Sequence, residues 1–332
     1  MNIISSSSTA SVAAQPRPSS RTLGRLLTAI APSIWVLILL VGYCAVLKPM
    51  LLQMPFQMVI FRQAAPLGLA VCAQLLVMRC RSIDLSLGGI FLLTNFVSTT
   101  ALVAGLPPQW AIVLPLLAGA AVGAVNGVFI TLFRASAVIV TLATGAILVG
   151  MVLYLSTDNA PGSVPQLIKD IGQGRLGPVP IAGLVWLAVA LILGIVLRVM
   201  VFGRLMQAVG SNPQAATLSG LPIRRVLLAS HIAAGALAAG GGLLLSGYVG
   251  VSTSNLGGDV VMNSIAGVIL GGVTFGSGRG GMLGPTVAAF ALTLLFNILN
   301  VFGAGESGKL IVQGLVIAAA AILAGMAQKG RR

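Results

Sequence analysis

The chain has 332 residues, of which 57% are hydrophobic and only 7% are charged, and its mean hydropathy is +1.05. This composition excludes an ordinary soluble domain. The formal net charge of +14 does not indicate a nucleic-acid partner, because the basic residues stand singly at the ends of apolar runs. We therefore predict an all-α integral membrane protein that lies in a lipid bilayer.

Residues 1–26 are rich in Ser and Thr and contain basic but no acidic residues, so we predict a disordered cytoplasmic tail. The apolar run that follows reaches Tyr43 and beyond, which is too long for the core of a cleaved signal peptide. We therefore predict that this run is a retained first membrane span.

Ten apolar runs have about the length that a spanning helix needs, roughly 20 residues. They lie at roughly 27–47, 63–78, 85–104, 111–133, 137–156, 179–200, 226–249, 260–277, 282–302 and 310–326. With the N-terminus inside, 14 of the 19 Lys and Arg residues fall on the cytoplasmic side, as the positive-inside rule expects. We predict one ten-span domain over residues 27–326, both termini in the cytoplasm, and a basic cytoplasmic tail over 327–332.

Ten spans divide into two halves of five, and an odd number per half inverts the second half relative to the first. The third run, with SIDLSLGGIFLL, and the eighth, with VILGGVTFGSGRGG, are both interrupted by glycines, and Asn126 and Asn297 take similar places in the runs that follow. The sequence therefore favours two inverted five-helix halves. The run 260–277 could instead enter the membrane and return, but the charge rule favours a full crossing.

Asp84 is the one acidic residue at the start of an apolar run on the inner side. Two roles stay open: a helix cap with Arg79 and Arg81 as charge partners, or a group that lines a transport path. Amides such as Asn126 either bond between helices or contact cargo. The candidate path residues are Asp84, Ser86, Asn126, Gly271, Gly272 and Asn297.

Signatures of catalysis are missing from the sequence. Residues 303–310, GAGESGKL, nearly match a phosphate-binding P-loop, but Leu310 stands where that motif needs Ser or Thr. His231 is the only histidine, and the five acidic residues form no pair that could hold a metal. We therefore predict no catalytic residue, no metal and no cofactor, and a protein that is not an enzyme.

Residues 201–225 contain the longest polar, turn-rich stretch between apolar runs in the C-terminal half, and they lie inside by the charge count. Asn212 before Pro213 indicates a turn or helix cap, and Gly220 ends one or two predicted helical turns. A simple connector would need only a few residues. We predict that this loop presents a rigid, short helix to a partner.

Several motifs in the same order resemble those of the ribose-type permease family of bacterial ABC importers, over about residues 60–325. The matches are AVGSNPQAATLSGL within the 201–225 loop, Ile83–Gly89 (IDLS-x-GG), Gly123–Leu142, Ile265–Thr286 and QGL at 313–315. Members usually have glycines just before IDLS, whereas this chain has Arg81 and Ser82 there.

This resemblance implies a multi-pass permease subunit of the bacterial inner membrane that imports a monosaccharide, such as a ribose-like pentose, another simple sugar or a polyol. The implied partners are an ABC ATP-binding subunit, a second permease subunit that is a copy or a homologue, and a periplasmic substrate-binding protein. The 201–225 loop would dock on the ATPase. The implied coupling residues are Gly203, Arg204, Gly210, Asn212, Pro213, Ala215, Ala216, Ser219 and Gly220. A nucleoside or branched-chain amino acid permease, and an ion-coupled secondary transporter, stay open as alternatives.

Overall fold

The computed structural model describes residues 31–100, 105–156, 162–253, 256–278 and 280–329. In order, the elements are α2 (Pro32–Leu47), η1 (Pro49–Leu52), α3 (Met54–Arg79), α4 (Leu87–Thr99), α5 (Trp110–Leu132), α6 (Ala137–Leu155), α7 (Gln166–Gln173), β1 (Arg175–Leu176), β2 (Val179–Pro180), α8 (Ile181–Val199), α9 (Val201–Ser211), α10 (Pro213–Leu218), α11 (Ile223–Val249), α12 (Val260–Leu270), α13 (Leu283–Val301) and α14 (Glu306–Lys329). The predicted tail 1–26 lies outside the described residues. Of the predicted tail 327–332, residues 327–329 end α14 and 330–332 lie outside the description.

The described part of the chain is all-helical apart from one two-stranded hairpin, in which β1 pairs with β2 in antiparallel register. Six helices are long and apolar enough to cross a membrane, namely α3, α5, α6, α8, α11 and α13. Three shorter apolar helices, α2, α4 and α12, have 10–17 residues. A helix lies in each predicted run, but the count of ten spans stays a prediction, because only six helices meet the length and composition of a span.

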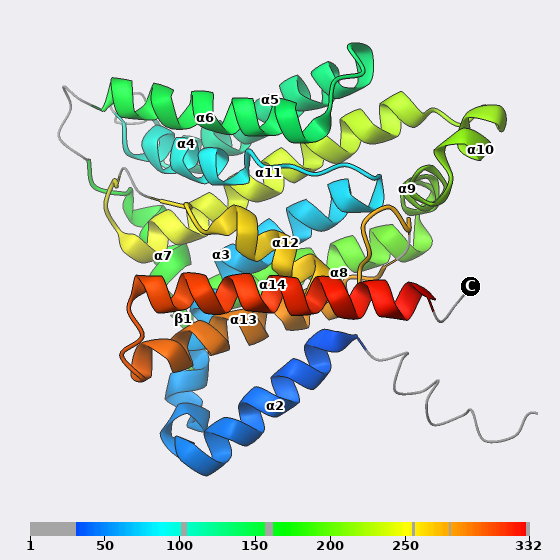
Figure 1. Cartoon of the computed structure of the whole chain (residues 1–332). Helices are drawn as coiled ribbons and strands as arrows, with labels where there is room; N and C mark the ends of the chain where they lie inside the picture. The colour runs from blue at the N-terminus through cyan, green and yellow to red at the C-terminus, as the bar shows by residue number, and fades with distance from the viewer. Residues whose placement is uncertain (1–30, 101–104, 157–161, 254–255, 279, 330–332) are drawn as a thin grey trace, which may run out of the picture. The chain divides into compact units, whose positions relative to one another are not determined.

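Helices α3 and α11 pack against each other and form the centre of the fold (Figure 1). The apolar window of α3 is 72% buried and that of α11 is 56% buried, against 17% for the peripheral helix α6. Helix α11 packs on α4 and α5, while α3 packs on α12 and α13. In the same way, α4 contacts α6, and α12 contacts α14.

Small residues bring α5 and α11 into close contact. A Cβ on Gly119 would lie 2.6 Å from the Cβ of Ala239, and a Cβ on Gly123 would overlap the carbonyl of His231. One turn further, a Cβ on Gly127 would lie 2.8 Å from the Cδ1 of Leu228. Glycine at every fourth position lets two helix backbones approach, as in small-xxx-small membrane interfaces. This packing brings the end of α5 against the first half of α11.

Short elements lie at two opposite ends of the helix bundle (Figure 1). Helices α9 and α10 lie with the last residue of α3 at one end, since Arg79 bonds to Gly203. Helix α7 and the β1–β2 hairpin lie at the other, where Gly172 packs on Gly247 near the end of α11. The sequence predicted only one or two helical turns in the 201–225 loop. Residues 201–211 are also helical, because Met206 and Val209 share a buried face with the glycines of this helix.

Candidate functional site

Between α3 and α4 the chain is non-helical over residues 80–86, although Ser82, Asp84 and Ser86 are buried. Buried backbone outside a helix must find hydrogen-bond partners in the protein. The backbone N–H of Leu85 donates to the Thr141 hydroxyl at 2.9 Å, and that of Ser82 donates to the carbonyl of Val77 at 3.0 Å. A side-chain hydroxyl and a backbone carbonyl thus satisfy two backbone N–H groups of this irregular interior segment.

Asp84 is the centre of a buried hydrogen-bonded cluster. Its Oδ1 accepts the backbone N–H of Ser86 at 2.9 Å and the hydroxyl of Ser86 at 2.6 Å. Asn126 donates from Nδ2 to the Ser86 hydroxyl at 2.9 Å, and its Oδ1 accepts from the Thr144 hydroxyl at 2.7 Å. Asp84, Ser86 and Asn126 are each fully buried. The structure therefore brings together three of the predicted path residues, and α4 begins directly after one of them, Ser86.

His231 of α11 completes what we call the Asp84 cluster: Ser82, Asp84, Ser86, Asn126, Thr144 and His231. Its Nδ1 lies 3.8 Å from Oδ2 of Asp84, and its Nε2 lies 2.8 Å from the Ser82 hydroxyl. Within the described chain, Asp84 Oδ2 and His231 Nδ1 have no hydrogen-bond partner. His231 stands eight residues after the start of α11, about 12 Å along its axis. The cluster is therefore in the interior of the helix bundle.

Sequence reasoning missed the pairing of Asp84 with His231, because the two residues lie 147 positions apart. The available signal was the glycine spacing of α5. Gly123 and Gly127 both face His231 or its neighbours, so α5 carries Asn126 to the same place.

The other predicted path residues lie elsewhere. Asn297 donates to Oε1 of Gln63 at 2.9 Å and so joins α13 to α3. Gly271 ends α12 against Pro285, and Gly272 follows it. The glycine that approaches the start of α4 is instead Gly257, whose carbonyl oxygen would lie 2.8 Å from a Cβ on Gly88. The first turns of α4 and α12 are thus neighbours.

Helix α10 stands out from the fold and is held by its caps. The Asn212 side-chain oxygen accepts the backbone N–H of Ala215 at 3.0 Å, which is the N-cap that Ser, Thr, Asp and Asn provide. Gly220 has a φ of 70° and follows the helix, as a left-handed C-terminal glycine does. Leu218 is 90% exposed. The predicted coupling residues divide into an exposed set, Arg204, Asn212, Ala215, Ser219 and Gly220; the half-buried Pro213; and a buried set, Gly203, Gly210 and Ala216.

Two arginines tie α9 to the segment that contains Asp84. Arg81 Nε donates to the carbonyl of Gly210 at 2.7 Å, and its Nη2 donates to the carbonyl of Ser211 at 3.2 Å. Arg79, which is 4% exposed, donates to the carbonyl of Gly203 at 3.5 Å. The φ of Arg81 is 60°, a left-handed conformation that costs a non-glycine residue about 1–2 kcal/mol. This left-handed conformation explains why family members usually have glycine just before IDLS. In this chain the arginine accepts the strain and adds hydrogen bonds to α9.

The donor groups of the site offer little to a metal. In the part of the chain that the structure describes, no three His, Cys, Asp or Glu side chains come together. Cys44, Cys72 and Cys80 are buried free thiols, and the Cys80 thiol lies 3.4 Å from the Ser230 hydroxyl. The arrangement can therefore bind and position through hydroxyl, amide and guanidinium groups.

Comparison with known proteins gives a consistent result. Residues 58–321 match the family described as "Branched-chain amino acid transport system / permease component". The ribose import permease protein RbsC of Bacillus subtilis is 30% identical over 86% of this chain and 90% of its own length. A probable ABC transporter permease protein, y4mJ of Sinorhizobium fredii, is 32% identical over 80% and 79%. The autoinducer 2 import system permease protein LsrC of Yersinia pseudotuberculosis is 30% identical over 78% and 74%. No solved structure matches the chain.

Proposed function

This chain belongs to the family of permease components of branched-chain amino acid transport systems, and from that membership we propose its role. It is a multi-pass membrane protein and a non-catalytic permease subunit of the ribose type. We propose that it passes a monosaccharide or a similar polyol across the bacterial inner membrane, driven by a separate ATP-binding subunit. The names of the ribose and autoinducer 2 import permeases support this cargo class. The family description favours a branched-chain amino acid as the second candidate.

We infer ten membrane helices in two inverted halves with both termini in the cytoplasm. The mirrored packing supports the halves: α11 with α4 and α5 repeats α3 with α12 and α13. The charges support the orientation, because Arg79, Arg81 and Arg204 lie around α9. The α7 end carries both signs, with Lys169 and Asp170. The α9 and α10 end is therefore the cytoplasmic end in this proposal.

Helix α10 carries the proposal that a partner ATPase docks on this end. Leu218 is 90% exposed on a short helix that is capped at both ends, so α10 offers an apolar side chain in a fixed position for another protein to cover. We propose that an ABC ATP-binding subunit covers Leu218 and the exposed coupling residues around α10, which are Asn212, Ala215, Ser219 and Gly220. A second permease subunit and a periplasmic substrate-binding protein complete the proposed importer.

The contacts of α9 suggest how movement reaches the membrane interior. When the ATPase closes on α10, α9 moves with it, and Arg81 transmits this movement to residues 80–86 through the carbonyls of Gly210 and Ser211. The Asp84 cluster then shifts relative to α11 and α5. We propose that the cargo passes beside the first turns of α4 and α12, where Gly88 and Gly257 are neighbours.

Copurification tests this function. The tagged wild-type chain is extracted gently from its own cell, and the proteins present in near-equal amounts are identified. We expect an ABC ATP-binding subunit, and loss of at least about 90% of it with Leu218→Asp, because a carboxylate would replace the buried anchor of the contact. Leu176→Asp, at a leucine 63% exposed on β1 at the other end, is the matched control and should leave the complex intact.

Two results would contradict the proposal. If Leu218→Asp retains the ATPase like the wild type, α10 is not the docking helix. If the wild-type chain purifies alone, the ABC assignment of its energy source fails, and Asp84 becomes the candidate for an ion-coupling site in a secondary transporter.

A further inference from the structure

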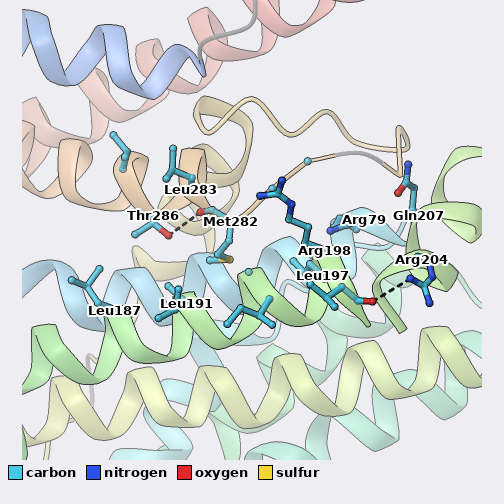
Figure 2. A pocket seen from close by; sticks show the side chains of 17 residues that line it. Arg79, Leu187, Leu191, Leu197, Arg198, Arg204, Gln207, Met282, Leu283 and Thr286 are labelled. Carbon is cyan, nitrogen blue, oxygen red and sulfur yellow. Dashed lines mark hydrogen bonds between the residues drawn. The ribbon is translucent and has the colours of Figure 1, made fainter. Parts of the chain in front are cut away.

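A cavity of about 900 Å³ lies between α8 and α13 and reaches α9 (Figure 2). Its long walls are apolar, with Leu187, Leu191 and Ile195 from α8 and Leu283 and Val287 from α13. Leu191 is 67% exposed and Leu283 is 71% exposed. The cavity therefore presents uncovered apolar surface on two helices of the membrane domain.

The other end of the same cavity is basic. Arg79, Arg198 and Arg204 line it with Gln207, and Figure 2 shows these four side chains on the side away from Leu187 and Leu191. The described lining contains no acidic residue. Arg79 is 96% buried, and its Nε has no hydrogen-bond partner in the described chain. Three guanidinium groups thus face a cavity that offers them no counter-charge.

The dimensions match one leaflet of a bilayer. From Leu187 to Arg198 the α8 axis rises about 16 Å at 1.5 Å per residue, which is close to half of the roughly 30 Å hydrocarbon core. The apolar end lies toward the middle of α8, and the arginines lie at its last turn. A molecule with an anionic head and a long apolar tail has this shape and polarity.

Other occupants fit the charges less well. Residues 1–26 include Arg17, Arg21 and Arg25 and no acidic residue, so this segment would be repelled. A second copy in the same orientation would bring no exposed carboxylate to this end. Apart from the buried Asp84, the acidic residues are Asp158, Asp170, Asp259 and Glu306, all in segments that the charge rule assigns to the opposite side. A free phosphate would leave the apolar walls uncovered.

We propose that this cavity binds an anionic phospholipid of the cytoplasmic leaflet, with its phosphate among Arg79, Arg198 and Arg204 and an acyl chain along α8 and α13. The inference rests on the orientation given under the proposed function. Arg198 belongs to α8, and Arg204 and Gln207 belong to α9, so the headgroup joins the membrane domain to the helix that supports α10. The lipid therefore stabilises the position of α9.

Native mass spectrometry of the purified complex, delipidated and then titrated with phosphatidylglycerol or phosphatidylcholine, tests the site. We expect phosphatidylglycerol to bind more tightly, and Arg198→Gln with Arg204→Gln to weaken it about 30-fold with little change for phosphatidylcholine. Arg134→Gln, at an exposed arginine in the α5–α6 connection that does not line the cavity, is the control and should bind like the wild type. Leu191→Trp, which fills the apolar end and keeps every arginine, should also weaken phosphatidylglycerol.

Each alternative gives its own result. Equal affinity for the two lipids, or unchanged affinity in the double variant, overturns the proposal. Competition by inorganic phosphate with no effect of Leu191→Trp indicates a simple anion site and also overturns it. A cross-link from residue 191 to a second copy replaces the lipid with a subunit interface. Loss of the ATPase with lipid affinity retained contradicts the proposed function and leaves the lipid site standing.

Discussion

The Asp84 cluster and helix α10 lie on one continuous line of contacts, yet their surfaces are opposite in kind. Five of the six residues of the cluster are buried and Thr144 is half-buried, and most of its polar side-chain atoms bond to neighbours within the chain, Asp84 Oδ2 and His231 Nδ1 excepted. Helix α10 has its apolar Leu218 90% exposed and is attached mainly through its caps and the buried Ala216. Folding of the chain alone therefore completes the contacts of the first region, whereas the second is the region that we propose a partner protein covers. Arg81 joins the two.

The largest effect on stability is expected at the close contact of α5 with α11, which positions the Asp84 cluster. Gly123→Leu would place a side chain into the carbonyl of His231, so α5 and α11 must separate. This separation would move Asn126 of α5 away from His231 of α11 and disrupt the Asp84 cluster. We expect a loss of about 3 kcal/mol or more, seen as little or no monodisperse protein by size-exclusion chromatography. Gly150→Leu on α6, where nothing lies within 4 Å, is the control and should give normal yield. A normal yield of the Gly123 variant would show that the close packing is not required.

The second-largest effect is expected from removal of the Asp84 carboxylate. Asp84→Ala leaves the N–H and hydroxyl of Ser86 without their acceptor, and such buried donors cost about 1–3 kcal/mol. The thermal midpoint of the purified protein should fall by several degrees, while Asp84→Asn, which keeps an acceptor oxygen, should fall less. Normal assembly of Asp84→Asn with lost uptake would instead favour the path-lining role.

Substitution of Arg81, which connects residues 80–86 to α9, should affect the coupling to ATP hydrolysis without lowering the stability of the protein. Arg81→Gly relieves the left-handed strain, worth about 1–2 kcal/mol, and removes the bonds to Gly210 and Ser211. We expect an unchanged or slightly higher thermal midpoint together with a severalfold loss of cargo-stimulated ATP hydrolysis in the assembled complex. Arg81→Lys can keep one charge-assisted hydrogen bond, so its stimulated ATP hydrolysis should lie between those of the wild type and the glycine variant. Full stimulation in the glycine variant would contradict the transmitting role of Arg81.

The smallest effect is expected at the cap of α10. Asn212→Ala removes the bond to the Ala215 N–H, which costs about 1 kcal/mol of helix stability and should weaken ATPase binding about fivefold. Asn212→Asp keeps the capping oxygen and should restore most of the affinity, measured by titrating the ATPase on the immobilised permease. The thermal midpoint of the isolated chain should not move, since α10 adds little to the packed core.

Local patterns predicted much of the fold. A helix lies in each predicted apolar run, since such runs must bury their backbone polar groups in helices. Asn212 and Gly220 predicted the limits of α10, because capping depends on neighbours in the chain. Helix α9 was missed, because its two glycines lower helix propensity while tertiary packing of Met206 and Val209 supports it.

The candidate site was harder to predict because it depends on contacts between distant segments. Asp84 and Asn126 were singled out as polar groups in apolar runs, but nothing in the sequence places His231 beside them. The correspondence of the third and eighth runs through their glycines stays a prediction, and the sequence did not single out Gly257, the glycine that lies beside the start of α4. The pair GG occurs at 257–258 and again at 271–272. Only the packing of α12 on α4 shows which of the two pairs lies beside α4.

The irregular segment 80–86 also determines the order in which the protein can be built. Its partners, Asn126, Thr141 and His231, are synthesised after it, and the last of them follows by more than 140 residues. Helix α4 has 13 residues, about 20 Å, so it cannot cross a bilayer core of about 30 Å alone. Residues 80–86 therefore reach their final set of side-chain contacts only after α11 has been synthesised. A chain interrupted before α11 would carry the Asp84 carboxylate without the imidazole that lies 3.8 Å from it in the folded protein.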